Sequence, residues 1–307
     1  MNTSRLGFSG LFSILALTAC GGGGGSDSPT NPTPAPPPEP TSLEILSNPL
    51  DYSIAQLDTA AKRYADNSYT GETNVAIADI SAVQNVYITL FGEDLASSPY
   101  LDIFEVSELV DANGNIDGVI QCSDSGSIKY SGKLDLSTGL GTIIVDYDQC
   151  LHYYLSAYHD GQFSVAITKS DDDNFEATSY FTSLSIGRGS QRATLKGLMK
   201  AEISYDPRTG YYNEELIQYM AATFNGEAYK INGTAFDGFN GLGYSSEFEG
   251  TMHIGSKGKL DFSYFSEEGG LPYASQGSLV VKGNRTAGIG HPSVREPQPF
   301  GSRCCIN

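Results

Sequence analysis

The sequence predicts a mainly β protein: an antiparallel meander that curls into a barrel-like or two-layer sheet, with one or two short N-terminal helices. From about residue 103 onward, apolar and polar residues alternate with the period of half-buried strands. Runs such as DANGN, STGLG and SDDDN interrupt this alternation at hairpin spacing. Tyrosine (19) and glycine (35) are abundant and tryptophan is absent, which suits strands and turns. Ten or so consecutive strands usually curl or split into two layers.

Residues 1–19 have the layout of an export signal. Arg5 lies in the short polar start, and the apolar run 8–17 is too short to cross a bilayer, which takes about 20 helical residues. The run ends in Leu17-Thr18-Ala19-Cys20, which resembles the lipobox of bacterial lipoproteins. This resemblance implies that Cys20 is the first mature residue and carries a diacylglycerol and a further acyl chain. The alternative is an ordinary secretory signal with an incidental cysteine.

Residues 20–42 predict a disordered stalk. Five glycines (21–25) are followed by seven prolines within residues 29–40, a composition that forms an extended spacer and no core. Gly21, and not an aspartate, follows Cys20, which by the lipoprotein resemblance implies the outer membrane. The lipid anchor makes the membrane one partner, and whether the protein faces the periplasm or the cell surface stays open.

The charge balance argues against nucleic acid as a partner. The chain has 18 basic and 36 acidic residues, hence a net charge of −18, whereas nucleic-acid binding needs a basic surface. Removal of residues 1–19, which contain the single charge of Arg5, gives −19. No motif predicts a cofactor.

Residues 43–102 predict a helix-containing part. Residues 54–66 are rich in helix formers, and Asp79 or Ser81 could cap a second helix. The apolar residues of that second segment recur at helical spacing: Ile77, Ile80, Val83, Val86 and Leu90.

Residues 103–283 predict the β domain. Its clearest alternations place Ile128, Tyr130, Leu134 and Leu136 on one face, then Phe163, Val165 and Ile167, then Tyr180, Leu184 and Ile186, then Leu260, Phe262 and Tyr264. Cys122 and Cys150 each close a strand-like run, and in an oxidising compartment we expect a disulfide between them. A zinc site is disfavoured because no CxxC or nearby histidine pair completes it.

Segments 69–86 (YTGETNVAIADISAVQNV) and 122–132 (CSDSGSIKYSG), with the second cysteine at 150, resemble a group of uncharacterised proteobacterial lipoproteins. The resemblance covers about half of the chain. It implies a similar fold and no activity.

Two polar motifs have alternative interpretations. Asp111, Asn113, Asn115 and Asp117 alternate as in calcium loops, but an EF-hand loop would have glycine where Ile116 stands, so we favour an Asn-Gly turn. His152 and His159 would lie on opposite faces of a strand, which disfavours a shared metal.

Function is predicted only by class. The tyrosines could form a recognition surface or be half-buried strand residues; among them are Tyr153, Tyr154, Tyr158, Tyr211, Tyr212 and Tyr219. We expect an outer-membrane lipoprotein that acts by binding or as an envelope-structural protein, with a protein or a glycan as partner. The alternative is an extracytoplasmic hydrolase that uses two carboxylates.

Residues 284–307 predict a disordered tail. This segment has three prolines and three arginines, little apolar periodicity, and the adjacent pair Cys304 and Cys305. The last strand is therefore expected within 277–283.

Overall fold

The structure is a computed structural model that describes residues 39–91, 106, 108–151, 157–188, 191–224, 226–239, 243–269, 275–291 and 303–306. Pro40–Asn307 form one compact unit, so the predicted helical part and the predicted β part fold together. The predicted signal peptide, Cys20 and nearly all of the predicted stalk lie outside the described residues.

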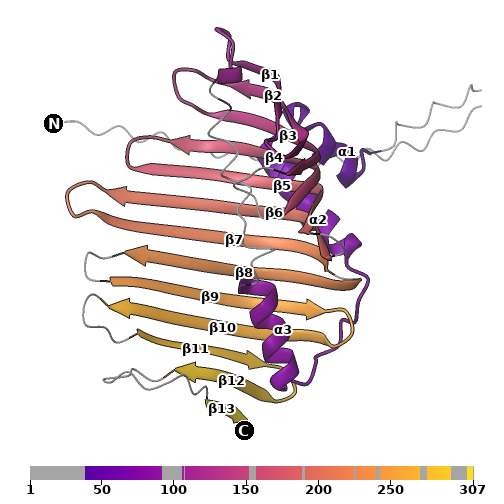
Figure 1. Ribbon diagram of the computed structural model, residues 1–307, viewed down its shortest axis with the longest axis vertical. Helices are drawn as coiled ribbons and strands as arrows, with labels where there is room; N and C mark the ends of the chain where they lie inside the picture. The colour runs from indigo at the N-terminus through magenta and orange to yellow at the C-terminus, as the bar shows by residue number, and fades with distance from the viewer. Residues whose placement is uncertain are drawn as a thin grey trace, which may run out of the picture. The chain divides into compact units, whose positions relative to one another are not determined.

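The predicted antiparallel meander is confirmed: thirteen strands form one sheet in chain order, each paired antiparallel with the next (Figure 1). The sheet is curved and open, with β1 and β13 as its edges, so it neither closes as a barrel nor divides into two layers. The strands are β1 (Asn115–Gln121), β2 (Ser125–Leu134), β3 (Gly141–Leu151), β4 (Tyr158–Ser170), β5 (Asn174–Arg188), β6 (Gln191–Asp206), β7 (Tyr211–Phe224), β8 (Glu227–Phe239), β9 (Gly243–Ile254), β10 (Gly258–Gly269), β11 (Ser275–Lys282), β12 (Thr286–His291) and β13 (Arg303–Ile306).

In the described part of the chain, the helical elements before the sheet include α1 (Ser42–Ser47), η1 (Pro49–Asp51), α2 (Ile54–Ser68) and α3 (Ile80–Phe91). Helix α1 begins inside the predicted stalk because Thr41 and Glu44 form a capping box there. The sequence analysis missed this short helix, whereas α2 and α3 match its two predicted helices.

Helix α2 packs on one face of the sheet, which we call the outer face. Its apolar side chains form a cluster with sheet residues; the buried members are Leu46, Leu57, Ala60, Ala61, Ala166, Tyr180 and Leu198. The Tyr180 hydroxyl donates a 2.7 Å hydrogen bond to Asp58 Oδ1, and that of Tyr219 donates a 2.8 Å bond to Asp66 Oδ1. Lys230 forms an ion pair of 2.6 Å with the same Asp66 oxygen. These bonds fix α2 against β5, β7 and β8.

Helix α3 belongs to the opposite face, which we call the inner face (Figure 1). Asp79, one of the two predicted caps, accepts a 2.7 Å hydrogen bond from the Ala82 amide, so the helix starts at Ile80. Among its described side chains, Ala82, Val83 and Val86 enter the core, whereas Ile80 and the preceding Ile77 are exposed. The packed face therefore includes the predicted Val83 and Val86 but is shifted away from Ile80.

The connection from α2 to α3 runs from the outer face to the inner face of the sheet. On the way, residues 72–76 form hydrogen bonds with the turns between strands. The Glu72 amide donates to the Gly255 carbonyl, in the β9–β10 turn, at 3.0 Å. The Ala76 amide donates to Lys259 at 2.8 Å, and the Ala76 carbonyl accepts from Asn284 at 2.8 Å. This strap joins two hairpins that lie far from it in the sequence.

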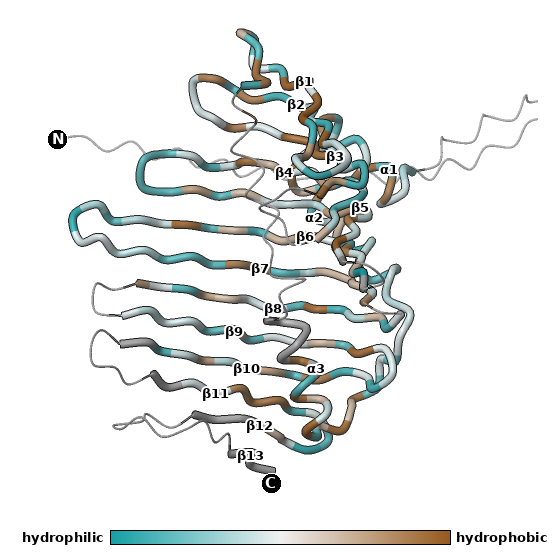
Figure 2. Tube along the Cα trace, viewed as in Figure 1, coloured by the Kyte–Doolittle hydropathy of each residue, from teal (hydrophilic) through white to brown (hydrophobic). Residues whose placement is uncertain are grey.

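The inner face carries the larger core, which reaches from β1 to β12. Figure 2 shows apolar residues alternating along the strands and hydrophilic residues gathered at the β4–β5 and β6–β7 turns. The predicted alternation is confirmed for Phe163, Val165, Leu260 and Phe262, which are all buried. A bulge between Phe181 and Leu184 changes the alternation in β5. Tyr180 consequently packs on the outer face, and its predicted partners Leu184 and Ile186 pack on the inner one.

The predicted disordered tail needs a correction. Strand β12 pairs with β11 over Thr286–His291 and buries Ala287, so the sheet continues beyond residue 283. Strand β13, which contains Cys304 and Cys305, pairs with β12. The alternation of β12 was hidden in the sequence because glycine and alanine fill half of its positions.

We expect that ending the chain after Lys282 lowers the free energy of unfolding by about 2 kcal/mol or more. This deletion removes the six residue pairs between β11 and β12, the buried Ala287 and the bond from Asn284 to the strap. Chemical denaturation of the full chain and of the chain that ends after Lys282 measures the effect. A chain that ends after His291 keeps β12 and should stay closer to the full chain. Equal stability of all three chains would contradict the assignment of β12 to the fold.

Candidate functional site

Four aromatic residues form a continuous row across neighbouring strands. The pairing register places Tyr205 opposite Tyr212, Tyr212 opposite Phe239, and Phe239 opposite Tyr244. Side chains alternate between faces along a strand, and these four share the inner face with buried Leu195, Met220, Ile231 and Phe248. We call Tyr205, Tyr212, Phe239 and Tyr244 the aromatic row.

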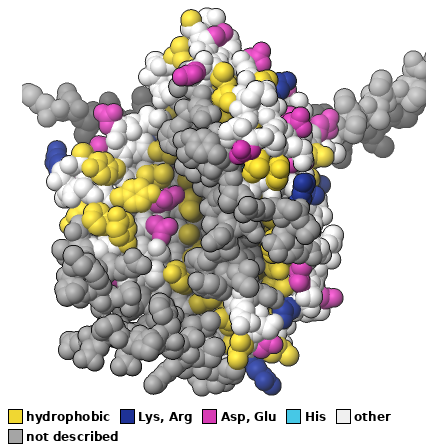
Figure 3. All heavy atoms as spheres, in the orientation of Figure 1, with side chains coloured by type: hydrophobic (Ala, Val, Ile, Leu, Met, Phe, Trp, Pro, Cys, Tyr) yellow, Lys and Arg dark blue, Asp and Glu magenta, His cyan; other side chains and the backbone are white. Residues whose placement is uncertain are grey.

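The aromatic row remains accessible at the strand ends far from the helices. Tyr205 is 46% exposed and Tyr244 is 60% exposed, although both are large aromatic residues on the face that carries the core. The rings of Phe239 and Tyr244 lie 4.7 Å apart between centroids, so these two rings pack against each other. Figure 3 shows hydrophobic side chains gathered over the left-hand ends of the middle strands, with acidic side chains beside them.

Two carboxylates flank the aromatic row on the inner face. Glu214 on β7 lies directly opposite Asp237 on β8. This pair is the next inner-face pair after Tyr212 and Phe239, counted from the strand ends toward the middle of the sheet. Directly opposed like charges destabilise a sheet, and among the described residues no lysine or arginine forms an ion pair with either carboxylate. The hydroxyl of Tyr212 donates a hydrogen bond to Glu214.

Burial and the nearby negative charges shift the pKa of the Tyr212 hydroxyl. Burial raises the pKa of its hydroxyl, and the hydrogen bond to Glu214 and the charges of Glu214 and Asp237 raise it further. Tyr212 therefore stays a neutral donor at physiological pH. The resulting site combines flat aromatic rings with two negative charges.

A second acidic group lies on the outer face. Glu176, Glu202 and Glu215 are consecutive cross-strand neighbours on β5, β6 and β7, and they line a depression of about 340 Å³. Lys200 bridges two of them, at 2.9 Å from Glu176 and 2.6 Å from Glu202. The hydrogen bond from Lys200 outweighs burial and holds the pKa of Glu176 below its ordinary value. A general acid needs a raised pKa, so this arrangement suits an ion pair better than acid–base catalysis.

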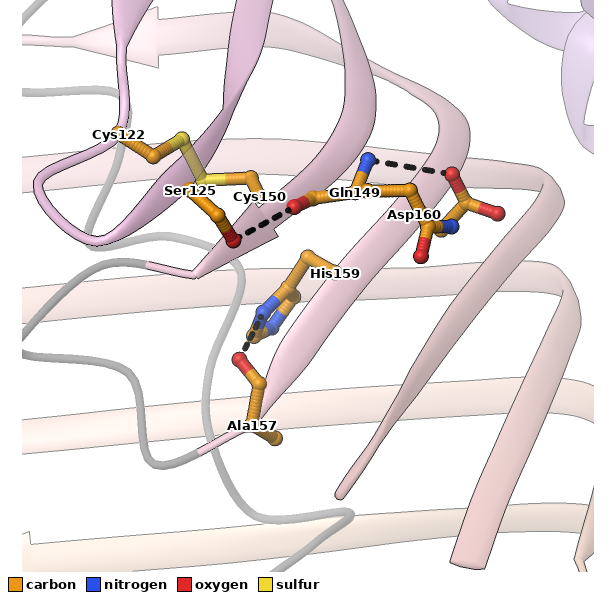
Figure 4. The surroundings of a disulfide bond; sticks show 7 residues. All are labelled: Cys122, Ser125, Gln149, Cys150, Ala157, His159 and Asp160. Atoms are coloured by element: carbon orange, nitrogen blue, oxygen red, sulfur yellow. Dashed lines mark hydrogen bonds between the residues drawn. A yellow bond between two sulfur atoms is a disulfide. The ribbon is translucent and has the colours of Figure 1, made fainter. Parts of the chain in front are cut away.

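The predicted cysteine pair is present as a disulfide between Cys122 and Cys150, with Cα atoms 5.6 Å apart (Figure 4). It closes a loop with a sequence separation of 28, for which chain entropy predicts a stabilisation of about 3 to 4 kcal/mol.

Near the disulfide, His159 is buried, its Nδ1 is 3.2 Å from the Ala157 carbonyl, and its ring packs on Tyr147. His152, its predicted opposite-face neighbour, lies outside the described residues.

The weak calcium candidate is a turn in the structure. One carboxylate oxygen of Asp111 accepts hydrogen bonds from the amides of Asn113 (2.7 Å) and Asn115 (2.9 Å). Gly114 has φ of +80°, a backbone conformation that favours glycine. Asp117 lies on β1, beyond the turn. Among the described residues, no three histidine, cysteine, aspartate or glutamate side chains gather as a metal site would require.

The tyrosines named in the sequence analysis differ in their burial and contacts. Tyr219 binds α2 through Asp66, and burial together with that bond raises its pKa to about 12. Tyr211 is exposed, Tyr212 is in the aromatic row, and Tyr153 and Tyr154 lie outside the described residues. Sequence reasoning missed Tyr205, Phe239 and Tyr244, because only the strand register brings them together.

The chain matches no protein-family model, no curated protein and no solved structure. In the described part of the chain, none of the helices has the length and apolar character needed to cross a membrane.

Proposed function

We propose that this chain is a lipid-anchored, extracytoplasmic binding protein whose ligand lies on the aromatic row. The observation that carries the proposal is the exposure of an aromatic row on a face that is otherwise core. Exposed aromatic patches with polar neighbours are typical of recognition surfaces, because tyrosine offers a large rigid contact area and a polar hydroxyl.

The anchor is proposed from the sequence at Cys20. Two or three acyl chains hold a protein stably on a bilayer, and the Gly- and Pro-rich segment that follows suits a spacer between lipid and folded domain. By the same lipoprotein resemblance we propose the outer membrane as its location. A tethered sheet of this kind would present the aromatic row to molecules within reach of the envelope.

The alternative of a carboxylate-dependent hydrolase has less support. In the acidic depression on the outer face, Lys200 forms ion pairs with two of the three carboxylates, those of Glu176 and Glu202. Glu214 and Asp237 lie on a sheet face bordered by exposed rings, which suits contact with an extended ligand. Binding is therefore the function that the described geometry supports best.

For the anchor, we expect that Cys20→Ala abolishes incorporation of a palmitate analogue and moves the protein from the membrane fraction to the soluble fraction. The lipid chains provide the membrane affinity in this account, so no other part of the chain should replace them. Metabolic labelling and fractionation of exported protein measure both effects. Unchanged membrane association of Cys20→Ala would exclude the lipid anchor.

For the binding surface, a photo-crosslinking residue in place of Tyr244 should form adducts in living cells. The matched control places the same residue at Glu247, which is exposed on the same strand β9 but points to the outer face. Gel shifts followed by mass spectrometry detect protein and glycan adducts alike. Adducts of equal yield at both positions, or at neither, would contradict a ligand on the aromatic row.

A further inference from the structure

We infer that the ligand of the aromatic row is a cationic polypeptide segment, recognised through lysine or arginine side chains. This inference rests on the proposed function and specifies its ligand class. Its basis is the combination of aromatic rings and uncompensated carboxylates on one part of the inner face.

Charge on this part of the inner face has one sign. At the ends of β6 to β9 far from the helices, Glu214 and Asp237 are the charged residues among the described inner-face positions; the other positions there are apolar, aromatic or uncharged polar. Arg208, in the turn after β6, is the basic residue next to this region along the chain. A bound cation would relieve the repulsion between the two facing carboxylates.

Aromatic rings strengthen the preference for a cation. Lysine and arginine bind over the faces of tyrosine and phenylalanine rings, and arginine does so most often. Within this protein, Lys196 lies 5.5 Å from the ring of Tyr64, and Lys230 lies 5.7 Å from that of Tyr219. The aromatic row offers the same kind of surface, and no lysine or arginine of the described residues lies over its rings.

The size of the row fits an extended segment. Neighbouring strands are about 4.8 Å apart, so four rings span about 14 Å from first to last. An extended peptide rises about 3.3 Å per residue, so about four or five residues cover this distance. Basic side chains at alternate positions would then repeat along one side of the peptide, facing the rings and carboxylates. The net charge of −18 would also accelerate the approach of such a ligand.

The test uses the full exported chain in a neutral detergent and a fluorescent peptide of alternating arginine and serine. Fluorescence anisotropy should show binding that weakens as salt is raised, whereas the peptide with glutamate in place of arginine should not bind. The double variant Glu214→Gln/Asp237→Asn should weaken binding about tenfold. Tyr244→Ala should also weaken it, because an exposed ring that contacts the ligand is lost.

The matched control is Glu247→Gln/Glu249→Gln, which removes the same number of negative charges, but from exposed outer-face positions of β9. It should change the affinity less than twofold, and thermal unfolding checks that every variant is folded. Equal weakening by both double variants would show attraction to net charge alone and would overturn the inference.

The two proposals fail differently. Failure of the arginine peptide to bind, or preference for a neutral oligosaccharide of linked glucose units, would overturn the cationic ligand. If photo-crosslinks at position 244 persist in that case, the binding surface itself would stand. Loss of those crosslinks as well would remove both proposals.

Discussion

The structure depends on a continuous ladder of backbone hydrogen bonds that joins each strand to the next along the chain. In such a meander, neighbouring strands pair the backbone N–H and C=O groups of one another, but two broad faces of the sheet remain to be covered. Strand β6 has 16 residues and spans about 54 Å, whereas α2 has 15 residues and is about 22 Å long. The helices can therefore cover only part of each face. The outer core lies under α1 and α2, the inner core reaches from β1 to β12, and the aromatic row lies at strand ends outside both clusters.

The covered part is held together by contacts between distant segments. Three sheet residues, Tyr180, Tyr219 and Lys230, hold helix α2 against the sheet by donating hydrogen bonds to aspartates of the helix. Residues 72–76 then hydrogen-bond to the β9–β10 hairpin and carry the chain from the outer face to the inner one. The disulfide fastens the β1–β2 turn to β3 near one edge of the sheet. These contacts hold the helices and the strap to the sheet, and the aromatic row lies at the strand ends far from the helices.

Much of the fold was predictable because its signals are local. The period-two alternation predicted the strands, the aspartate before an apolar helix predicted the Asp79 cap, and two strand-ending cysteines predicted the disulfide. Strand β12 was missed because its glycine and alanine residues give no alternation, and Tyr180 was misplaced because a bulge reverses the faces. The candidate site was not predictable in the same way. Tyr205 and Tyr244 are 39 residues apart in the chain, and only the register of four strands makes them members of one row.

Tyrosine nitration by tetranitromethane with peptide mapping measures whether the aromatic row is accessible in the folded protein. We expect rapid modification of Tyr205, Tyr211 and Tyr244, which are 44–60% exposed. Tyr130, Tyr147 and Tyr180 are at most 2% exposed and should remain unmodified in the folded protein. Protection of Tyr205 and Tyr244 to the level of Tyr180 would show that another part of the protein covers the row, and would contradict its role as a binding surface.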